Sequence, residues 1–239
     1  MNGEFDFLKE NVERIREEMT RAAQTAGRRP EEILLCAACK TRTVEMVRAS
    51  AALDIDLFGE NHVQELVEKT DAGAYLGKPG HMIGHLQTNK VKQVVGRASL
   101  IQSLDSQRLL LALEKEAAKR SLIQDVLVEV NIGREESKTG ISPEELWPFL
   151  EQAAAQPHIR VKGLMAIPPA ALDEKESRGY FAAMRKLFEQ ADTLSYPNQS
   201  MEILSIGMSD DFANAILEGA TLVRVGTAIY GPRYYPPKK

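Results

Sequence analysis

The sequence predicts an α/β protein, a single TIM-type (β/α)8 barrel with an additional N-terminal helix. Short apolar runs recur about eight times along the chain, most of them are separated by helical patterns, and no long Pro/Gly/Ser linker interrupts the series. Eight such units are the number that closes a β/α barrel, while an open doubly wound sheet fits the same alternation. We expect residues 1–239 to form one domain.

The N-terminal helix is predicted over residues 5–26, and Gly27 fits its stop. Its apolar positions follow the three-and-four spacing of an amphipathic helix: Leu8, Val12, Ile15, Met19, Ala22 and Ala23. Strands are expected near 33–39, 55–58, 81–84, 99–104, 125–131, 159–167, 202–206 and 222–225. Helical patterns cover 106–119, 142–154, 176–191 and 209–218. Residues 168–173 read as a flexible loop over the barrel mouth.

The bulk composition bounds the class of protein. A chain of 239 residues with 44% hydrophobic content can bury one sizeable core. The net charge is −4 and the cations are scattered, which argues against nucleic-acid and anionic-membrane partners. The acidic start carries no signal region, and no apolar run approaches the roughly 20 residues that span a bilayer. We expect a cytoplasmic protein.

Two short motifs resemble metal or redox sites but have the wrong geometry for them. Cys36 and Cys39 form a CxxC, yet on a strand they point to opposite faces, so we expect both to be buried apolar side chains. His81 and His85 would lie roughly 13 Å apart on a strand, which argues against a shared zinc ion. His85 then either lines the barrel mouth or bonds to backbone.

Lys40 places an amine where the first strand hands over to a helix. Strand parity puts Lys40 on one face with Leu34, Cys36 and Ala38, which we take to be the barrel interior. A lysine that forms an imine must lose its proton, and burial near apolar walls or another cation favours this. A surface lysine that simply ends a strand fits the position equally well.

Two turns near the C-terminus are suited to a phosphate, which such barrels commonly hold after strands seven and eight. Ser209, after Gly207, can cap the next helix or donate its hydroxyl to a phosphate. Gly226 and Thr227 offer backbone N–H groups and a second hydroxyl. Arg224 shares the face of Gly226 and needs a partner, either a pyridine nitrogen or a barrel carboxylate. An amine with a phosphate site indicates pyridoxal 5′-phosphate (PLP).

The remaining strand ends supply further polar or soft side chains. Asn61 follows the second strand and either edges the pocket or caps a helix, and Met165 stands at the sixth strand. Asp105 and Asn131 follow strands four and five. Lys138, in the polar loop after strand five, either assists ligand entry or is simply solvated.

Several of these segments together resemble the pyridoxal-phosphate homeostasis protein family over essentially the whole chain. The segments are Cys39-Lys40-Thr41, Phe58-Gly59-Glu60-Asn61, residues 83–90, Gly163-Leu164-Met165, residues 207–211 and Val223-Arg224-Val225-Gly226-Thr227. The resemblance implies a barrel like the N-terminal domain of alanine racemase, with Lys40 in an internal aldimine and Arg224 at the pyridine nitrogen. It implies a phosphate held by Ser209, Gly226 and Thr227. We place Asn61, His85 and Met165 in the same cofactor pocket.

The implied role is to bind PLP and supply it, with PLP-dependent enzymes as clients and without robust catalytic turnover. Cys39, Arg42 and His62 stand where serine, lysine and tyrosine are common in the family. A weak amino-acid racemase is the alternative, in which Tyr230, Tyr234 or Tyr235 would have to supply a second base. A Schiff-base aldolase and an empty interaction scaffold are further alternatives. We expect a monomer, because no heptad seam is present.

Overall fold

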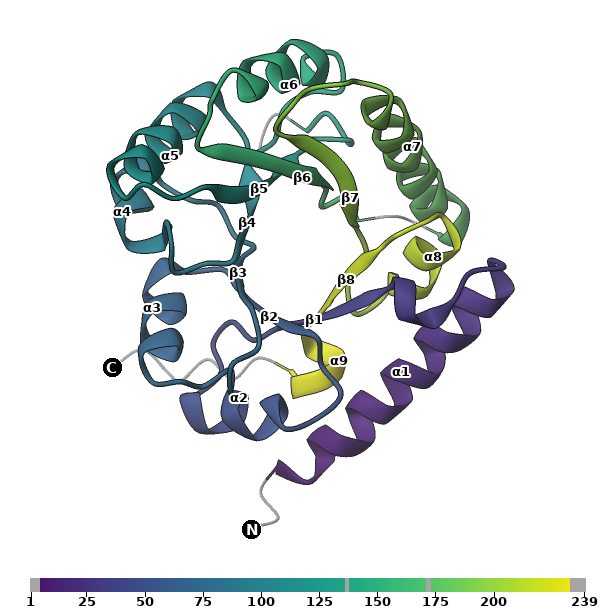
Figure 1. The fold of residues 1–239 in the computed structure, drawn as a ribbon. Coiled ribbons are helices and arrows are strands. Elements are labelled where there is room, and N and C mark those ends of the chain that lie inside the picture. The colour runs from purple at the N-terminus through teal and green to yellow at the C-terminus, as the bar shows by residue number, and fades with distance from the viewer. Residues whose placement is uncertain (1–4, 136–137, 171–172, 233–239) are drawn as a thin grey trace.

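The computed structural model describes residues 5–135, 138–170 and 173–232. Eight parallel strands pair in chain order, and the last pairs with the first to close a barrel with helices around it (Figure 1). This confirms the predicted barrel and excludes the open sheet. Closure is achieved by residues that are far apart in sequence, since Cys36 of the first strand lies in register with Arg224 of the last.

The strands are β1 (Leu34–Ala38), β2 (Leu57–Glu60), β3 (Gly80–Met82), β4 (Leu100–Leu104), β5 (Gln124–Glu129), β6 (Ile159–Met165), β7 (Gln199–Ser205) and β8 (Leu222–Val225). The α-helices are α1 (Phe7–Thr25), α2 (Val44–Ala51), α3 (Val63–Asp71), α4 (Val91–Val94), α5 (Gln107–Lys119), α6 (Leu146–Ala154), α7 (Glu174–Asp192), α8 (Phe212–Leu217) and α9 (Thr227–Tyr230). Short 3-10 turns cover Pro30–Glu32 and Thr88–Lys90. The strands and long helices lie where periodicity predicts them.

The inside of the barrel is lined by every second strand residue. One small apolar cluster inside the barrel contains Cys36, Leu57, Ile83 and Leu222, and another contains Leu100, Leu127 and Met165. Cys39 instead belongs to the large core between the strands and the outer helices. The two cysteines therefore lie on opposite sides of the barrel wall, as strand alternation predicts.

The N-terminal helix α1 lies along the outside of the barrel, against α8 and α9 (Figure 1). All six apolar positions expected to face the core are buried. Asn11 adds a hydrogen bond from its side-chain amide to the carbonyl of Ile229, 2.9 Å away. This helix thus fastens the start of the chain to the segment that follows the last strand.

Gly163 marks an irregular region in β6. Its φ is +146°, and a Cβ at this position would lie 1.9 Å from the carbonyl oxygen of Ile203 on β7. The register of the β6–β7 pairing shifts between Val161 and Gly163. Glycine is therefore required here because the neighbouring backbone occupies the space of a side chain.

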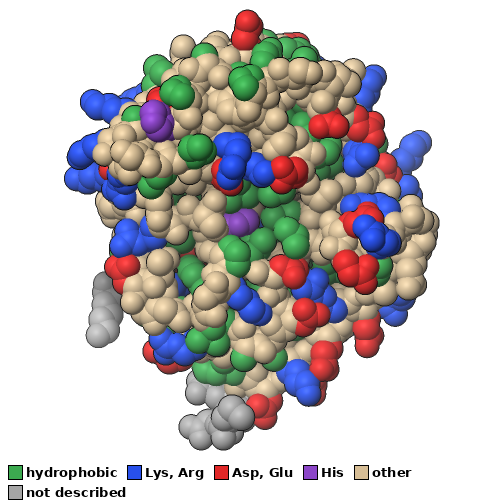
Figure 2. Space-filling view, in the orientation of Figure 1, with side chains coloured by type: hydrophobic (Ala, Val, Ile, Leu, Met, Phe, Trp, Pro, Cys, Tyr) green, Lys and Arg blue, Asp and Glu red, His purple; other side chains and the backbone are tan. Residues whose placement is uncertain are grey.

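On the face shown in Figure 2, hydrophobic side chains surround a histidine at the centre, and basic and acidic side chains alternate around it. Several of the basic groups of the molecule are paired, for example Arg160 with Asp125 at 2.7 Å and Arg178 with Glu218 at 2.7 Å.

Among the described residues, no helix is both long and apolar enough to cross a membrane.

Candidate functional site

Lys40 lies two residues beyond β1, at the barrel end where all eight parallel strands terminate. Its side chain is half-buried. The next residue, Thr41, has φ +65°, the left-handed region that residues other than glycine seldom adopt. Thr43 then caps α2 by accepting a hydrogen bond from the backbone N–H of Met46. Lys40 therefore sits in a sharp, well-defined turn.

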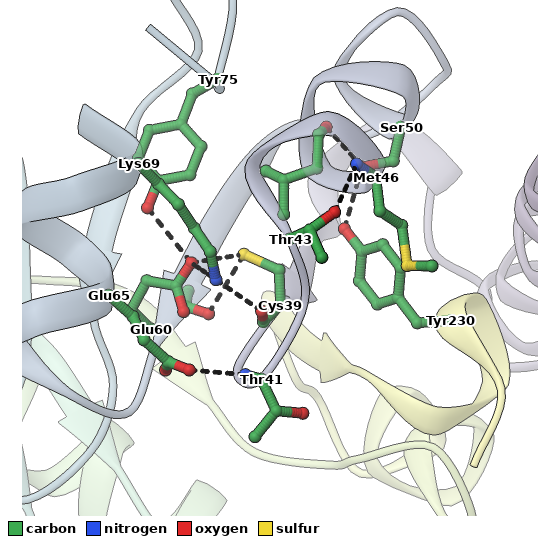
Figure 3. Close-up of polar contacts among 12 residues, drawn as sticks. Cys39, Thr41, Thr43, Met46, Ser50, Glu60, Glu65, Lys69, Tyr75 and Tyr230 are labelled. Carbon is green, nitrogen blue, oxygen red and sulfur yellow. Dashed lines mark hydrogen bonds and ion pairs between the residues drawn. The ribbon is translucent and has the colours of Figure 1, made fainter. Parts of the chain in front are cut away.

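A buried polar cluster holds this turn from outside the barrel wall (Figure 3). The Lys69 ammonium donates to the carbonyl of Cys39 and to Oε1 of Glu60, both at 2.8 Å. The Cys39 thiol donates to the same Glu60 oxygen at 2.8 Å. On the other side of Lys40, the N–H of Thr41 donates to Glu65 Oε1 at 2.7 Å. Both neighbours of the amine-bearing residue are thus anchored.

Glu60 is the buried acidic group of this cluster. Its burial raises the pKa of the carboxyl group above the ordinary value, and the Lys69 charge opposes that rise. Burial also raises the pKa of the Cys39 thiol well above its usual range, so the sulfur stays protonated. Glu60 faces the outer core, because it has the opposite parity to Gly59 and Asn61.

The loops after β7 and β8 meet at Ser209. Its hydroxyl oxygen accepts hydrogen bonds from the backbone N–H groups of Gly226, at 3.1 Å, and Ala228, at 3.3 Å. Ser209 does not cap the following helix, which begins only at Phe212 and has no side-chain cap. Because its oxygen accepts two hydrogen bonds, the Ser209 hydroxyl keeps its own hydrogen to donate, and an anion is a suitable acceptor for it. Thr227 is exposed and begins α9.

Two glycines set the position of these loops. Gly207 has φ +89°, and a Cβ would lie 2.5 Å from the Cβ of Ala215 in α8. Its small size thus allows α8 to pack closely against this turn. A Cβ at Gly226 would lie 3.0 Å from the carbonyl of Ala38. Gly226 therefore brings the Ser209 loop against the end of β1, next to the Lys40 turn.

Arg224 points into the barrel and is only 4% exposed. Its guanidinium donates to the Ser205 hydroxyl at 2.6 Å, to the Ser205 carbonyl at 2.7 Å and to the carbonyl of Ala166 at 2.9 Å. Burial lowers its pKa. The predicted alternative, a structural ion pair, is not formed with any carboxylate in the described part of the chain. These bonds use three of the five N–H groups of an arginine.

The opposite side of the mouth is formed by the ends of β2, β3 and β4. Asn61 and His85 line one hollow together with Lys90. His85 is 52% exposed, and its Nδ1 lies 2.9 Å from Oδ2 of Asp105, so its partner is a carboxylate rather than backbone. Asn61 caps no helix, since α3 is preceded by His62. Met165, the last residue of β6, is fully buried in an apolar cluster inside the barrel.

Glu129 is a candidate site residue that the sequence analysis did not single out. It ends β5, is 6% exposed, and accepts a hydrogen bond from the Thr139 hydroxyl at 2.7 Å. Burial raises the pKa of its carboxyl group, with Asp105 adding to the rise. Glu129 lies two residues after the inward-facing Leu127, so strand alternation alone predicts that its side chain also faces inward. In the loop that follows, Lys138 pairs with Glu135 and donates to the carbonyl of Pro168 at 3.2 Å.

Comparison with known proteins places this arrangement in a family. Residues 7–234 match the family model described as "Alanine racemase, N-terminal domain". A protein of Aquifex aeolicus named "Pyridoxal phosphate homeostasis protein" is 42% identical over 95% of this chain and 98% of its own length. An Escherichia coli protein of the same name is 36% identical over 97% of this chain and 99% of its own length.

Solved structures agree with the sequence matches. PipY of Synechococcus elongatus, solved with PLP bound, has a TM-score of 0.77 and 29% identity, covering 90% of this chain and all of that one. We conclude that the chain belongs to the alanine racemase N-terminal domain family and, within it, to the pyridoxal phosphate homeostasis proteins.

Proposed function

We propose that this protein binds pyridoxal 5′-phosphate at the barrel mouth and holds it covalently on Lys40, as a carrier that takes part in intracellular PLP homeostasis. One observation carries the proposal. Gly226 brings the Ser209 loop against the end of β1, so an amine and an anion-binding loop are neighbours. A homologue in the same family is solved with PLP bound, and many relatives are named for PLP homeostasis.

The polar groups of the mouth fit PLP in three further ways. Arg224 has two N–H groups without a hydrogen bond to the described residues, which suits a ring nitrogen. Oδ1 of Asn61 is buried and, among the described residues, accepts no hydrogen bond. Such an orphaned acceptor costs free energy unless a ligand or water satisfies it. The Ser209 hydroxyl, which the N–H groups of Gly226 and Ala228 hold in place, can donate its own hydrogen to a phosphate.

When bound, PLP supplies an electrophilic aldehyde. The Lys40 amine adds to the aldehyde carbon and one water molecule leaves, and addition of water reverses the reaction and frees the cofactor. Arg224 donates a hydrogen bond to the ring nitrogen and, as a cation, disfavours protonation there. An unprotonated ring is a weaker electron sink. These residues therefore favour storing and releasing the cofactor over transforming amino acids.

The proposal extends to the setting in which the carrier acts. We propose that it works as a cytoplasmic monomer and delivers PLP to PLP-dependent enzymes. Reversible attachment supports this role, because hydrolysis at Lys40 releases an intact cofactor. The half-exposed position of Lys40 gives water access to that bond.

The test is reduction with borohydride after addition of PLP, followed by mapping of the labelled residue. We expect the wild type to develop a visible absorption band and to carry the label on Lys40. Lys40→Ala should lose both, whereas Lys90→Ala, which removes another amine at the same mouth, should retain both. Equal labelling of Lys40→Ala, or no band in the wild type, refutes the proposal. Turnover of an amino acid by the loaded protein would favour the racemase alternative.

A further inference from the structure

A chain of buried hydrogen bonds runs through the barrel interior behind Arg224. The Arg224 guanidinium donates to the Ser205 hydroxyl at 2.6 Å, and that hydroxyl donates to Oε1 of Gln102 at 2.7 Å. Nε2 of Gln102 lies 2.9 Å from Nδ1 of His81. Every member is at most 5% exposed. The chain therefore joins β8, β7, β4 and β3 across the inside of the barrel.

The direction of every bond in this chain is fixed by Arg224. An arginine only donates hydrogen bonds, so the Ser205 oxygen must accept from Arg224. The Ser205 hydroxyl hydrogen is then donated in a hydrogen bond to the Gln102 carbonyl oxygen. The Gln102 amide then has only N–H groups to offer His81, whose Nδ1 must accept. His81 thus carries its hydrogen on Nε2. Burial lowers the pKa of His81 to about 3, which keeps the ring neutral and able to accept.

The chain contains no carboxylate that would neutralise Arg224. Its polar groups are oxygens and an uncharged ring, so they orient the guanidinium without neutralising it, while the carboxylates of Glu129 and Asp211 favour its charge from a distance. Two of its N–H groups remain without a hydrogen bond to the described residues. A buried guanidinium with spare N–H donors calls for an acceptor from a ligand.

We propose that Ser205, Gln102 and His81 are positioning residues that aim the Arg224 guanidinium at the ring nitrogen of the bound cofactor. This inference rests on the proposed function, since it assumes that PLP occupies the mouth. On this inference, the three buried side chains affect only the hydrogen bond from Arg224 to the ring nitrogen of the ligand. A purely structural role would instead affect all ligands of the same shape equally.

The decisive comparison uses two ligands, PLP and its 1-deaza analogue, in which carbon replaces the ring nitrogen. Ser205→Ala removes one acceptor of Arg224 and should weaken PLP binding about tenfold, while the analogue should change less than about twofold. Ser103→Ala is the matched control, because this buried neighbour of Gln102 has a hydroxyl without a partner among the described residues. It should leave both affinities unchanged. Equal weakening of the two ligands by Ser205→Ala overturns the inference.

A second readout requires no cofactor. In protein carrying 15N-labelled histidine, NMR should show His81 as a neutral ring with its hydrogen on Nε2 and an acceptor at Nδ1. Gln102→Leu should shift the Nδ1 resonance and reproduce the selective loss of PLP affinity. A hydrogen on Nδ1 in the wild type overturns the inference. If wild-type protein binds no PLP, the proposed function fails and this inference with it, whereas label on Lys40 with equal weakening of both ligands overturns this inference alone.

Discussion

Replacement of Lys69 by methionine tests the buried ion pair behind the Lys40 turn. Methionine keeps much of the apolar length of lysine and removes only the charge. Glu60 then remains inside the protein without its cation, at a place where the two side chains are 0% and 2% exposed. Breaking a buried pair in this way costs about 3–5 kcal/mol. We expect the free energy of unfolding to fall by that amount.

Urea denaturation at pH 7, followed by circular dichroism, measures this loss. The double variant Lys69→Met/Glu60→Gln is the matched control, because it buries no charge at all. It should recover more than half of the lost stability, since a neutral pair of similar volume leaves no uncompensated carboxylate. A single variant within about 1 kcal/mol of the wild type would show that the pair does not stabilise the fold.

The pH dependence of the stability loss in Lys69→Met distinguishes an effect of charge from an effect of packing. Burial raises the pKa of Glu60 in the folded state, so the folded protein binds this proton more tightly than the unfolded chain does. Stability therefore declines as the pH rises from the ordinary carboxyl range through the raised value. Loss of Lys69 raises the pKa further, so the destabilisation should shrink on acidification toward about pH 5. The same loss at both pH values would indicate packing alone.

Three further outcomes are expected. Ser209→Ala should weaken PLP by about tenfold or more, because a hydrogen bond to a charged group contributes about 1.5–3 kcal/mol, and should leave binding of phosphate-free pyridoxal unchanged in a spectroscopic titration. Gly163→Ala should cost more than about 2 kcal/mol in urea denaturation, because its Cβ would overlap the Ile203 carbonyl, whereas Gly179→Ala on the open face of α7 should be stabilising by up to about 1 kcal/mol. Thr139→Val removes the bond that lowers the pKa of Glu129, so an NMR titration of that carboxyl should show a higher pKa than in the wild type.

The barrel was predictable because the apolar residues of its strands and helices recur with regular spacing. Alternation along β1 and into the residue after it separates Cys36 from Cys39, and the three-and-four spacing of α1 identifies all of its buried apolar residues. The shortest helices, α4 and α9, were not predicted, because four residues are too few to show a helical period. The start of α8 was placed three residues early, since Ser209 has the composition of a cap but bonds to the next loop instead.

Residues of the candidate site were predictable only where their own position at a strand end indicates their chemistry. Lys40, Ser209 and Arg224 follow from strand ends and parity. The partners that hold them come from other strands and helices, as Lys69 does for the Lys40 turn and Ser205 for Arg224. Such pairings depend on the register of the whole barrel, which no local pattern specifies. Glu129 was missed although it lies inside the strand predicted near 125–131, where parity with Leu127 points it inward.

The pairing of β1 with β8 has a consequence for how the protein is made. Lys40 emerges early in synthesis, but its neighbours near Gly226 emerge only after the first seven strands. A ribosome-bound chain without β8 presents an amine and no anion loop, so it has no complete pocket for the cofactor. Because ligand binding adds stability only to the state that binds it, PLP would favour the closed barrel over every partly folded form. The concentration of PLP would then affect how long a newly made chain stays open to chaperones and proteases.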